Sequence, residues 1–327
     1  MSNARRFVIA TVLLGCVNII ASGLTSTVAA QSDPSSDGAS TGSDASDGFD
    51  PYPDQVDLLT VQAHPDDEGV FGGLIAHYAA CQKRDVVSVV LTSGEWGHGL
   101  PHHTSPDQTP DYSYDDSDQP RFEKIPADAL YPCYYREGEM ARALLMMGVR
   151  YRPVMPRMKD RSGLQPWGQP DPAFELWGGR ERVVDFVVEQ IRRFKPLVIV
   201  TMSKDGFNDN PQHMAASRSA VLAAQVAGDP DRHPESAKRY GTWEPKKVYL
   251  HAGPNETHPR VHLMRWDGPC DATAGTAQTL AARANALHES QQMKRECEAE
   301  TGFVLVHSSV GDDRVNRDNL FENIPPR

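Results

Sequence analysis

A histidine and three acids lie side by side in the stretch AHPDDE, residues 63–68. Three adjacent carboxylates repel one another, and burying such charges without a partner is costly. A metal cation removes that cost, because imidazole nitrogens and carboxylate oxygens are ligands of catalytic zinc sites. His64 and Asp67 stand three residues apart, with Pro65 stiffening the turn between them. This spacing lets both side chains face one ion, so a third ligand must come from elsewhere in the chain.

His213 is the best-placed candidate for that third ligand. It opens a predicted helix soon after the apolar run at residues 197–202. Asp66 would then lie beside the ion without binding it, where it can take a proton from water. The alternative for the two aspartates is structural, because an acid just before a helix can cap its first turn.

Apolar runs alternate with amphipathic segments along the chain, and this alternation predicts the α/β class. We expect a Rossmann-like, three-layer α/β/α domain with a mostly parallel sheet. Strands are expected at 56–63, 86–93, 197–202, 247–252, 261–266 and 303–309, and helices at 69–83, 136–148, 180–194, 211–227 and 273–297.

The segments that follow three of these strands carry the polar residues of interest. They are residues 63–68, 92–95 and 203–213. Ligands of such sheets bind at the carboxyl ends of the strands, so the three segments are expected to gather at one edge. Two long segments, 96–135 and 151–179, interrupt the pattern. Long segments without regular structure are usually functional or disordered. We expect these two to wall a substrate pocket, with disorder as the alternative.

The N-terminal region has the pattern of an exported protein. Residues 1–30 are predicted to be a signal peptide, with Arg5 and Arg6 before an apolar stretch that is shorter than the about 20 residues of a membrane span. A membrane anchor is the alternative, including a lipoprotein form processed at Cys16. Residues 31–54, rich in Ser, Asp and Gly, are expected to be a disordered acidic linker, and the domain is expected at 55–327. The protein is therefore expected to be secreted or associated with the cell envelope, without stable membrane insertion once the signal is cleaved.

Charge and cysteine usage limit the partners and the kind of metal site. The formal net charge is −11 and no basic run stands out, which argues against nucleic acid as a partner. An even number of cysteines after the signal suits an oxidising compartment, although three pairings are possible and the sequence does not choose among them. No C-x-x-C motif occurs, so a cysteine zinc site is not expected. The sequence does not define an oligomeric state. The four cysteines are Cys81, Cys133, Cys270 and Cys297.

Five stretches together resemble one known family. AHPDDE after a first strand resembles the signature of the LmbE-like (PIG-L) zinc-dependent de-N-acetylases, which include N-acetylglucosaminyl-phosphatidylinositol and mycothiol-pathway deacetylases. Four further stretches match in the same order: LTSGEWG, REGEMARALLMMGV, PLVIVTMSKDGFNDNPQH and ALHESQ. The resemblance spans about residues 56 to 292. A dinucleotide-dependent oxidoreductase is disfavoured, because the glycines after the first strand do not form G-x-G-x-x-G.

The resemblance implies a mechanism as well as a ligand set. It implies that His64, Asp67 and His213 bind Zn²⁺ and that Asp66 is the general base. Zinc would polarise the amide carbonyl and lower the pKa of bound water towards ~7. The implied reaction removes an N-acetyl or other N-acyl group from an N-acetylglucosamine-type sugar or glycoconjugate.

The resemblance also places other residues near the substrate. Arg136, Glu95 and His288 are expected to lie at or near the substrate. For Arg136 the alternative is an ion pair with Glu139 on the same helix, and for the other two it is a buried polar role. The tryptophans that are available to stack on a sugar ring, or to anchor the loops instead, are Trp96, Trp167 and Trp177.

One position departs from the family pattern. The family often has His-Pro-Asp-His where this chain has Asn-Pro-Gln-His at 210–213. Asn210 can donate a neutral hydrogen bond to an oxyanion but cannot carry a proton. Either Asp66 acts as both base and acid, or another residue replaces the missing histidine. The candidates are His98, His102 and His103.

The departure at 210 leaves two other functions open beside the deacetylase. One is a catalytically weak carbohydrate-binding protein that keeps the metal structurally. The other is an amidase acting on a non-sugar amide. Zinc and sugar binding without hydrolysis would favour the first, and competition between sugar and non-sugar amides would identify the second. Metal content with amine release from a panel of N-acetylated sugars tests the deacetylase.

Overall fold

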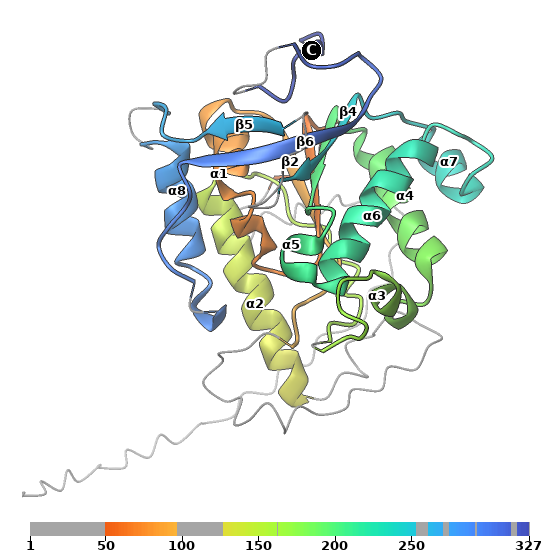
Figure 1. Cartoon of the computed structure of the whole chain (residues 1–327), viewed down its shortest axis with the longest axis horizontal. Helices are drawn as coiled ribbons and strands as arrows, with labels where there is room; N and C mark the ends of the chain where they lie inside the picture. The colour runs from red at the N-terminus through yellow and green to blue at the C-terminus, as the bar shows by residue number, and fades with distance from the viewer. Residues whose placement is uncertain are drawn as a thin grey trace, which may run out of the picture. The chain divides into compact units, whose positions relative to one another are not determined.

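Within the residues that the structure describes, six strands form one sheet in the order β2-β1-β3-β4-β6-β5 (Figure 1). The structure is a computed structural model that describes residues 50–96, 127–161, 163–252, 261–270, 275–291, 293–314 and 319–326, with only the backbone at 127–134 and 261. The first four strands pair in parallel, and β6 pairs antiparallel to both β4 and β5. The strands are β1 (Leu58–Gln62), β2 (Val86–Val90), β3 (Val198–Thr201), β4 (Lys247–His251), β5 (Val261–Arg265) and β6 (Glu300–Ser308).

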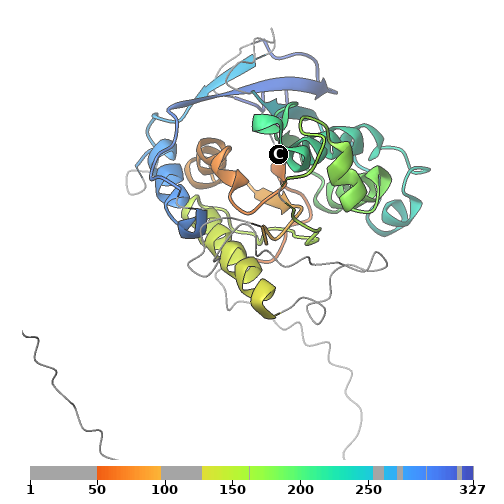
Figure 2. The ribbon, with the colours of Figure 1, turned by 60° about the horizontal axis from the view of Figure 1, so that its bottom comes forward.

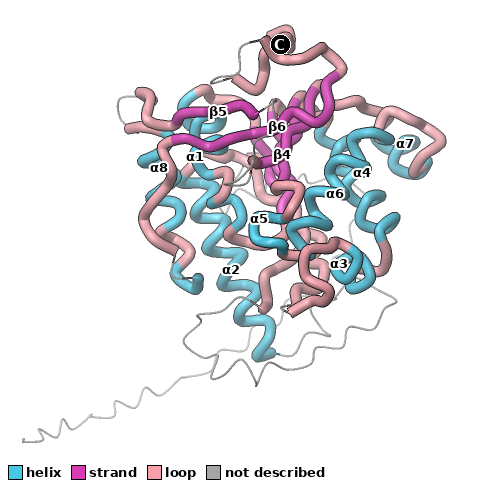
Figure 3. The backbone as a smooth tube through the Cα atoms, in the orientation of Figure 1, coloured by secondary structure: helices cyan, strands magenta, loops and turns pink. Residues whose placement is uncertain are grey.

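Helices cover both faces of this sheet, which confirms the predicted α/β class (Figure 3). The helices α1, α2 and α8 lie on one side, and α3, α4, α6 and α7 on the other (Figure 1). The α-helices are α1 (Gly72–Ala76), α2 (Ala127–Met146), α3 (Asp171–Leu176), α4 (Arg180–Phe194), α5 (Gly206–Asp209), α6 (Pro211–Val226), α7 (Pro234–Tyr240) and α8 (Ala277–Asn285). Short turns of other helical types are η1 (Asp67–Gly69), η2 (His77–Cys81) and η5 (Glu289–Gln291).

Two apolar cores, one on each face, hold the layers together. Successive strand side chains point to opposite faces, so Leu58 of β1 packs in the core beneath α1, α2 and α8, whereas Leu59 packs in the core beneath α4 and α6. In β3, Val198 and Ile199 divide between the cores in the same way. Every residue of β1 is buried. A strand buried on both faces is typical of a parallel sheet covered by helices, and this is why the run read as continuously apolar.

The carboxyl ends of three neighbouring strands position the polar segments. β1 lies between β2 and β3, with Gln62 beside Val90 and Val61 beside Thr201. Residues 63–68, 92–95 and 203–213 therefore leave the sheet at one edge, as expected from the sequence. The antiparallel pair β5 and β6 lies side by side at the far end of the sheet from β2 (Figure 2).

The prediction of one long helix over 273–297 is wrong. The helix α8 ends at Asn285, and a short turn, η5, follows it. The reason lies in two buried acids elsewhere in the fold. His288 turns towards Glu68, with 2.6 Å between Nε2 and Oε1, and the Ser290 hydroxyl donates to Glu139. Leaving these two carboxylates buried without a partner would cost more free energy than the segment loses by leaving the helix.

The predicted helix over 69–83 is divided rather than continuous. It consists of η1, α1 and η2 in succession. A Cβ atom on Gly73 would lie 2.4 Å from the Trp266 ring, so only glycine allows this close approach. The short helices α3, α5 and α7 were not predicted, and α2 begins earlier than the helix predicted at 136–148.

A disulfide joins Cys81 to Cys270, which are 189 residues apart in the sequence. Cys297 is the free thiol among the cysteines whose side chains are described, and Cys133 lies outside that set. The bond ties the end of η2 to the segment between β5 and α8.

We expect a Cys81→Ala/Cys270→Ala variant to lose about 2–5 kcal/mol of unfolding free energy, because a long loop is no longer closed in the unfolded chain. Denaturant titration with and without a thiol reductant measures this loss. The reductant should lower the midpoint of the wild type and leave that of the variant unchanged. A wild type that does not respond to reductant would contradict the bond.

The predicted signal peptide at 1–30 and most of the predicted linker at 31–54 lie outside the described residues. Asp50 is described, and it forms an isolated parallel bridge with Tyr151. Across the parts of the chain that are described, no helix is both long and apolar enough to cross a membrane.

Candidate metal centre and active site

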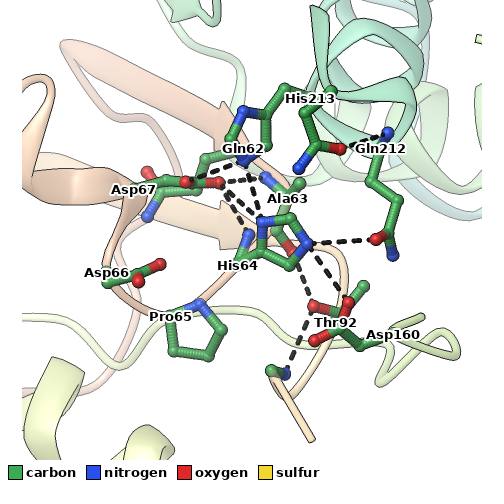
Figure 4. Close-up of polar contacts among 12 residues, drawn as sticks. Gln62, Ala63, His64, Pro65, Asp66, Asp67, Thr92, Asp160, Gln212 and His213 are labelled. Carbon is green, nitrogen blue, oxygen red and sulfur yellow. Dashed lines mark hydrogen bonds and ion pairs between the residues drawn. The ribbon is translucent and has the colours of Figure 1, made fainter. Parts of the chain in front are cut away.

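Three buried side chains converge at the sheet edge. His64 and Asp67 follow β1, and His213 lies in the first turn of α6, so the cluster joins residues 149 apart in the sequence (Figure 4). One ligand atom from each lies within 4.8 Å of the other two. The structure thus brings together the three residues that the sequence predicted as metal ligands.

Asp67 is held by the backbone of its own turn. Its Oδ2 atom accepts hydrogen bonds from the amides of Ala63, at 3.0 Å, and His64, at 2.7 Å. Its Oδ1 atom lies 3.2 Å from Nε2 of His213. Asp66 makes no side-chain capping bond to η1. The alternative of a simple helix cap is therefore wrong for Asp66. Asp67 instead fixes the turn with Oδ2, which also lies 3.6 Å from His64 Nδ1, and it faces His213 with Oδ1.

The hydrogen bonds of the two imidazoles define which nitrogen faces the centre. His213 Nδ1 lies 2.8 Å from the Gly206 carbonyl oxygen, an acceptor, so Nδ1 carries the hydrogen and Nε2 carries a lone pair. His64 Nε2 faces two more acceptors, Asp160 Oδ1 at 3.3 Å and Gln212 Oε1 at 3.3 Å, so in the neutral ring the lone pair is on Nδ1.

Two lone pairs and a carboxylate oxygen therefore point at one another. His64 Nδ1 and His213 Nε2 are 3.0 Å apart. Such an arrangement is repulsive unless a proton or a metal cation lies among the three atoms. Two imidazoles and one carboxylate suit a catalytic metal ion with an open position for water. The group at His64, Asp67 and His213 therefore fits a bound metal ion.

The ionisation of the ligands reflects the same demand for positive charge. Burial lowers the pKa of His64, but the carboxylates of Asp160 and Asp67 outweigh it and raise that pKa well above its ordinary value. Burial raises the pKa of Asp67, but the imidazoles of His213 and His64 outweigh it and hold that pKa well below the usual range.

Asp160 is a part of the centre that sequence reasoning missed. It is buried, and besides facing His64 it accepts a hydrogen bond from the Trp96 amide at 3.1 Å. It lies in the segment 151–179, where no periodic pattern or motif marks it. A carboxylate behind a ligating histidine orients the ring and raises its basicity, and Asp160 is placed for this task.

An Asp160→Asn variant is expected to bind the metal about 10- to 100-fold more weakly, because the ring of His64 loses its charged acceptor. Competition with a fluorescent chelator measures the affinity. Asp231→Asn, a change at an exposed acid, is the matched control and should leave the affinity unchanged. Equal affinities for the wild type and the Asp160 variant would remove Asp160 from this role.

Asp66 lies beside the cluster and is held by Arg136. The carboxylate and the Arg136 Nη2 atom are 3.0 Å apart, and the Asp66 side chain keeps 23% of its surface exposed. Arg136 also donates to the carbonyls of Gly94, at 2.6 Å, and Pro65, at 3.0 Å. A Cβ atom on Gly94 would lie 2.2 Å from Arg136 Nη1, which explains the glycine of the TSGE segment. Burial raises the pKa of Asp66, and the Arg136 guanidinium opposes this shift.

The other residues predicted near the substrate have protein partners. Glu95 is buried and accepts a hydrogen bond from the Asp160 amide at 2.7 Å; burial, followed by the Asp160 carboxylate, raises its pKa to about 8. His288 is buried against Glu68. Neither is among the residues that line the clefts around the metal centre. Their contact with substrate stays a prediction.

Arg136 has a different partner from the one considered as its alternative. Glu139 accepts hydrogen bonds from the amide of Ser290, at 2.7 Å, and from the Ser290 hydroxyl, at 2.5 Å. Among the described residues, Glu139 forms no ion pair with Arg136. Arg136 instead binds a neighbouring carboxylate, that of Asp66, and lines the cleft.

Asn210 caps α6. Its side-chain oxygen accepts from the Gln212 amide at 2.9 Å, so its NH₂ group is the part left to donate. Asn210 lines the cleft at the metal centre. The proposed substitutes His98, His102 and His103 lie outside the described residues.

A cleft of about 400 Å³ opens onto the cluster and onto Asp66. The segment 151–179 forms part of its wall, as the sequence predicted, through residues such as Arg161 and Trp167. Trp96 also lines it, and Trp167 is 45% exposed. Trp177 is buried in the core and donates to the Lys159 carbonyl, so the structure gives it the anchoring role.

Comparison with solved structures concerns the fold alone. GalB, the 4-carboxy-2-hydroxymuconate hydratase of Pseudomonas putida KT2440, superposes with a TM-score of 0.50 at 16% identity and covers 80% of this chain and 100% of that chain. GalB is a hydratase, so the fold by itself does not define the reaction.

Sequence comparison identifies the family. The chain is 35% identical over 206 residues to the 1D-myo-inositol 2-acetamido-2-deoxy-alpha-D-glucopyranoside deacetylase of Streptomyces avermitilis, covering 60% of this chain and 61% of that protein. It is 29% identical over 217 residues to the mycothiol S-conjugate amidase of Streptomyces coelicolor, covering 64% and 65%. The chain thus spans between 61% and 65% of the length of these two relatives. Residues 59–224 match the family model PIG-L, GlcNAc-PI de-N-acetylase, a stretch that contains all three converging ligands. The chain therefore belongs to the PIG-L family of GlcNAc-PI de-N-acetylases.

Proposed function

We propose that this protein is a zinc-dependent N-deacetylase that acts on an N-acetylglucosamine-type sugar or glycoconjugate. One observation carries the proposal: three ligand atoms converge beside an acid, Asp66, that is outside the ligand set and lines the same cleft. Family membership and the deacetylase of Streptomyces avermitilis support removal of an acetyl group from an acetylated amino sugar, and the amidase of Streptomyces coelicolor supports amide hydrolysis.

The donor set supports zinc. Two histidines and one carboxylate leave a fourth position open, the arrangement of catalytic zinc sites. When bound, zinc supplies Lewis acidity, which polarises the amide carbonyl and lowers the pKa of water towards ~7.

Asp66 moves the proton in the proposed reaction. Its carboxylate takes a proton from the attacking water, and Arg136 holds it in place through the ion pair at 3.0 Å. A base whose pKa lies nearer the working pH transfers protons more effectively, and burial raises the pKa of Asp66 in that direction. Asp66 then delivers the same proton to the leaving amine nitrogen, since the amide of Asn210 donates hydrogen bonds but has no acidic proton to transfer.

In the proposed reaction Asn210 does not transfer a proton but stabilises the negative charge that develops on the oxygen of the amide. Its NH₂ group donates to the former carbonyl oxygen as negative charge develops there. Because its own oxygen is engaged in the cap of α6, the orientation of this amide is fixed before substrate binds, and such preorganised donors are effective.

We expect Asn210→Asp to lower kcat by about 10²–10³-fold, since the donor is replaced by an acceptor of the same shape. The aspartate still caps α6, so the thermal midpoint and the metal content should stay close to wild type. Steady-state kinetics with metal analysis checks both. Unchanged kcat would exclude Asn210 from charge stabilisation.

The deciding experiment combines metal content with amine release. Purified protein should contain about one zinc per chain and release acetate and free amine from N-acetylglucosamine-type substrates. Release only from non-sugar amides would favour the amidase alternative. Zinc and sugar binding without release from any amide would favour the carbohydrate-binding alternative.

We also propose export to the exterior or the cell envelope. The signal-like pattern at residues 1–30 supports it, and so does the disulfide between Cys81 and Cys270, because disulfides persist in oxidising compartments. N-terminal sequencing of protein from the culture medium or envelope should find Gln31 first. Full-length protein confined to the cytoplasm would contradict export.

A further inference from the structure

A second chamber adjoins the candidate metal centre. Its volume is about 820 Å³, compared with about 400 Å³ for the cleft described above. Arg136 and Asn210 line the smaller cleft and are absent from the wall of the chamber. The two spaces share five lining residues: Asp66, Asp67, Asn208, His213 and Gln291. Two of the three proposed ligands, Asp67 and His213, and the acid Asp66 thus lie at the junction of the two spaces, whereas His64 lines only the smaller cleft.

The wall of the chamber is rich in apolar side chains. Val70, Phe207, Leu263 and Met293 line it. Phe207 and Leu263 are each 41% exposed. Exposed apolar side chains that gather around one opening mark a binding site more often than isolated ones do.

Among the described residues that line the chamber, the charged groups are all acidic apart from its histidines. Glu296, Glu298 and Glu300 are exposed and line it. The basic residues beside them in sequence, Lys294 and Arg295, do not line the chamber. Burial lowers the pKa of His251, another lining residue, to about 4, so this imidazole is neutral at pH 7. The chamber therefore suits an apolar, uncharged group and disfavours an anion.

We infer that the chamber receives the acyl half of the substrate, and that the enzyme accepts neutral, unbranched N-acyl chains longer than acetyl. The inference rests on the proposed amide hydrolysis. An amide carbonyl held at the junction sends its acyl carbon one way and its nitrogen the other. The groups suited to an amino sugar are in the smaller cleft, where Arg136, Asp160 and Asn210 supply polar contacts and Trp167 an exposed ring. The acyl group is left facing the chamber.

The chamber is much larger than the acyl end of an acetamide requires. Pockets of 300–1,000 Å³ typically enclose a drug-sized ligand, whereas the acyl end of an acetamide is a single methyl group. Each methylene that moves from water into the chamber adds apolar contact, which raises kcat/KM until the space is filled.

The first test is a series of N-acyl glucosamines with acetyl, butanoyl, hexanoyl and octanoyl groups, assayed by amine release with the zinc-loaded enzyme. Each added methylene should raise kcat/KM about two- to fourfold, so hexanoyl should exceed acetyl at least about tenfold. An adipoyl group has the length of hexanoyl and ends in a carboxylate. It should be cleaved at least about tenfold more slowly than hexanoyl, because the glutamates repel it and its charge must be desolvated.

The second test fills the chamber from its wall. Leu263 lies on β5, at the edge of the sheet, where a tryptophan suits the strand. Leu263→Trp should lower the hexanoyl-to-acetyl ratio of kcat/KM about tenfold. Val306→Trp is the matched control, since Val306 is an exposed apolar residue of β6, 38% exposed, that does not line the chamber. It should leave the ratio at the wild-type value.

The outcomes separate the acyl inference from the proposed function. If acetyl is cleaved and hexanoyl is cleaved more slowly, the chamber does not receive the acyl chain and the deacetylase proposal stands. If Leu263→Trp and Val306→Trp leave the same ratio, the acyl chain lies elsewhere. If no N-acyl glucosamine releases amine, the proposed function itself fails.

Discussion

An Asp66→Asn variant is expected to keep its metal ion and its fold while kcat falls by about 10²–10⁴-fold, the usual contribution of a positioned general base. The amide has the size of the carboxylate and its oxygen still accepts from Arg136, whose Nη2 lies 3.0 Å from Asp66 in the wild type. It cannot take a proton from water. Turnover of an N-acetylated amino sugar and metal content per chain are the two measurements.

Turnover and metal content together distinguish a general-base role of Asp66 from a role as a metal ligand. Loss of metal together with activity would place Asp66 among the ligands, against the geometry of the cluster. Wild-type turnover in Asp66→Asn would remove it from the mechanism altogether. Asp231→Asn again serves as the exposed control and should match the wild type in both respects.

Replacement of Asp67 should have the largest effect on the metal, and the choice of replacement separates binding from folding. Both Asp67→Asn and Asp67→Ala are expected to reduce the metal content from about one ion per chain to near zero, with loss of turnover, because the charged ligand is gone. Metal analysis of the purified variants measures this.

The two variants should differ in stability. In Asp67→Asn the amide oxygen still accepts from the backbone of Ala63 and His64, and the NH₂ group faces His213 Nε2, where the carboxylate oxygen lay at 3.2 Å. In Asp67→Ala both amides lose their acceptor, at a cost on the order of 1–3 kcal/mol each. Denaturant titration of the metal-free proteins should therefore rank Asp67→Asn clearly above Asp67→Ala. Equal stabilities would mean that Asp67 does not fix the turn.

The helix α4 and the parallel strands were predicted correctly from the local pattern of apolar residues. The predicted helix at 180–194 has the observed bounds, Arg180–Phe194, because its apolar residues recur at helical spacing and Pro196 follows. The strands are buried on both faces and so appear in sequence as unbroken apolar runs. The segment 273–297 shows the limit of this reasoning. Its sequence suits a helix, but its second half is not helical, because His288 and Ser290 contact the buried acids Glu68 and Glu139, which are distant in the chain.

Three of the residues that we propose as ligands or general base could be named from the sequence because their motif is local. His64, Asp66 and Asp67 occupy one turn at a strand end, where residue type and spacing alone restrict the chemistry. His213 required the further rule that parallel strands end at one edge, together with the family resemblance, and the structure places it 3.0 Å from His64.

The sequence by itself determined the α/β class, the family resemblance and the identity of the converging side chains, because each depends on periodicity or on a short motif. The tertiary structure alone decided what surrounds them: Asp160 behind His64, the capping role of Asn210, the buried partners of Glu95 and His288, and the two spaces that meet at the metal centre. These features depend on contacts between segments distant in the chain. Such contacts form only when the sheet order brings the segments together, and the need to satisfy buried charges then outweighs local preference.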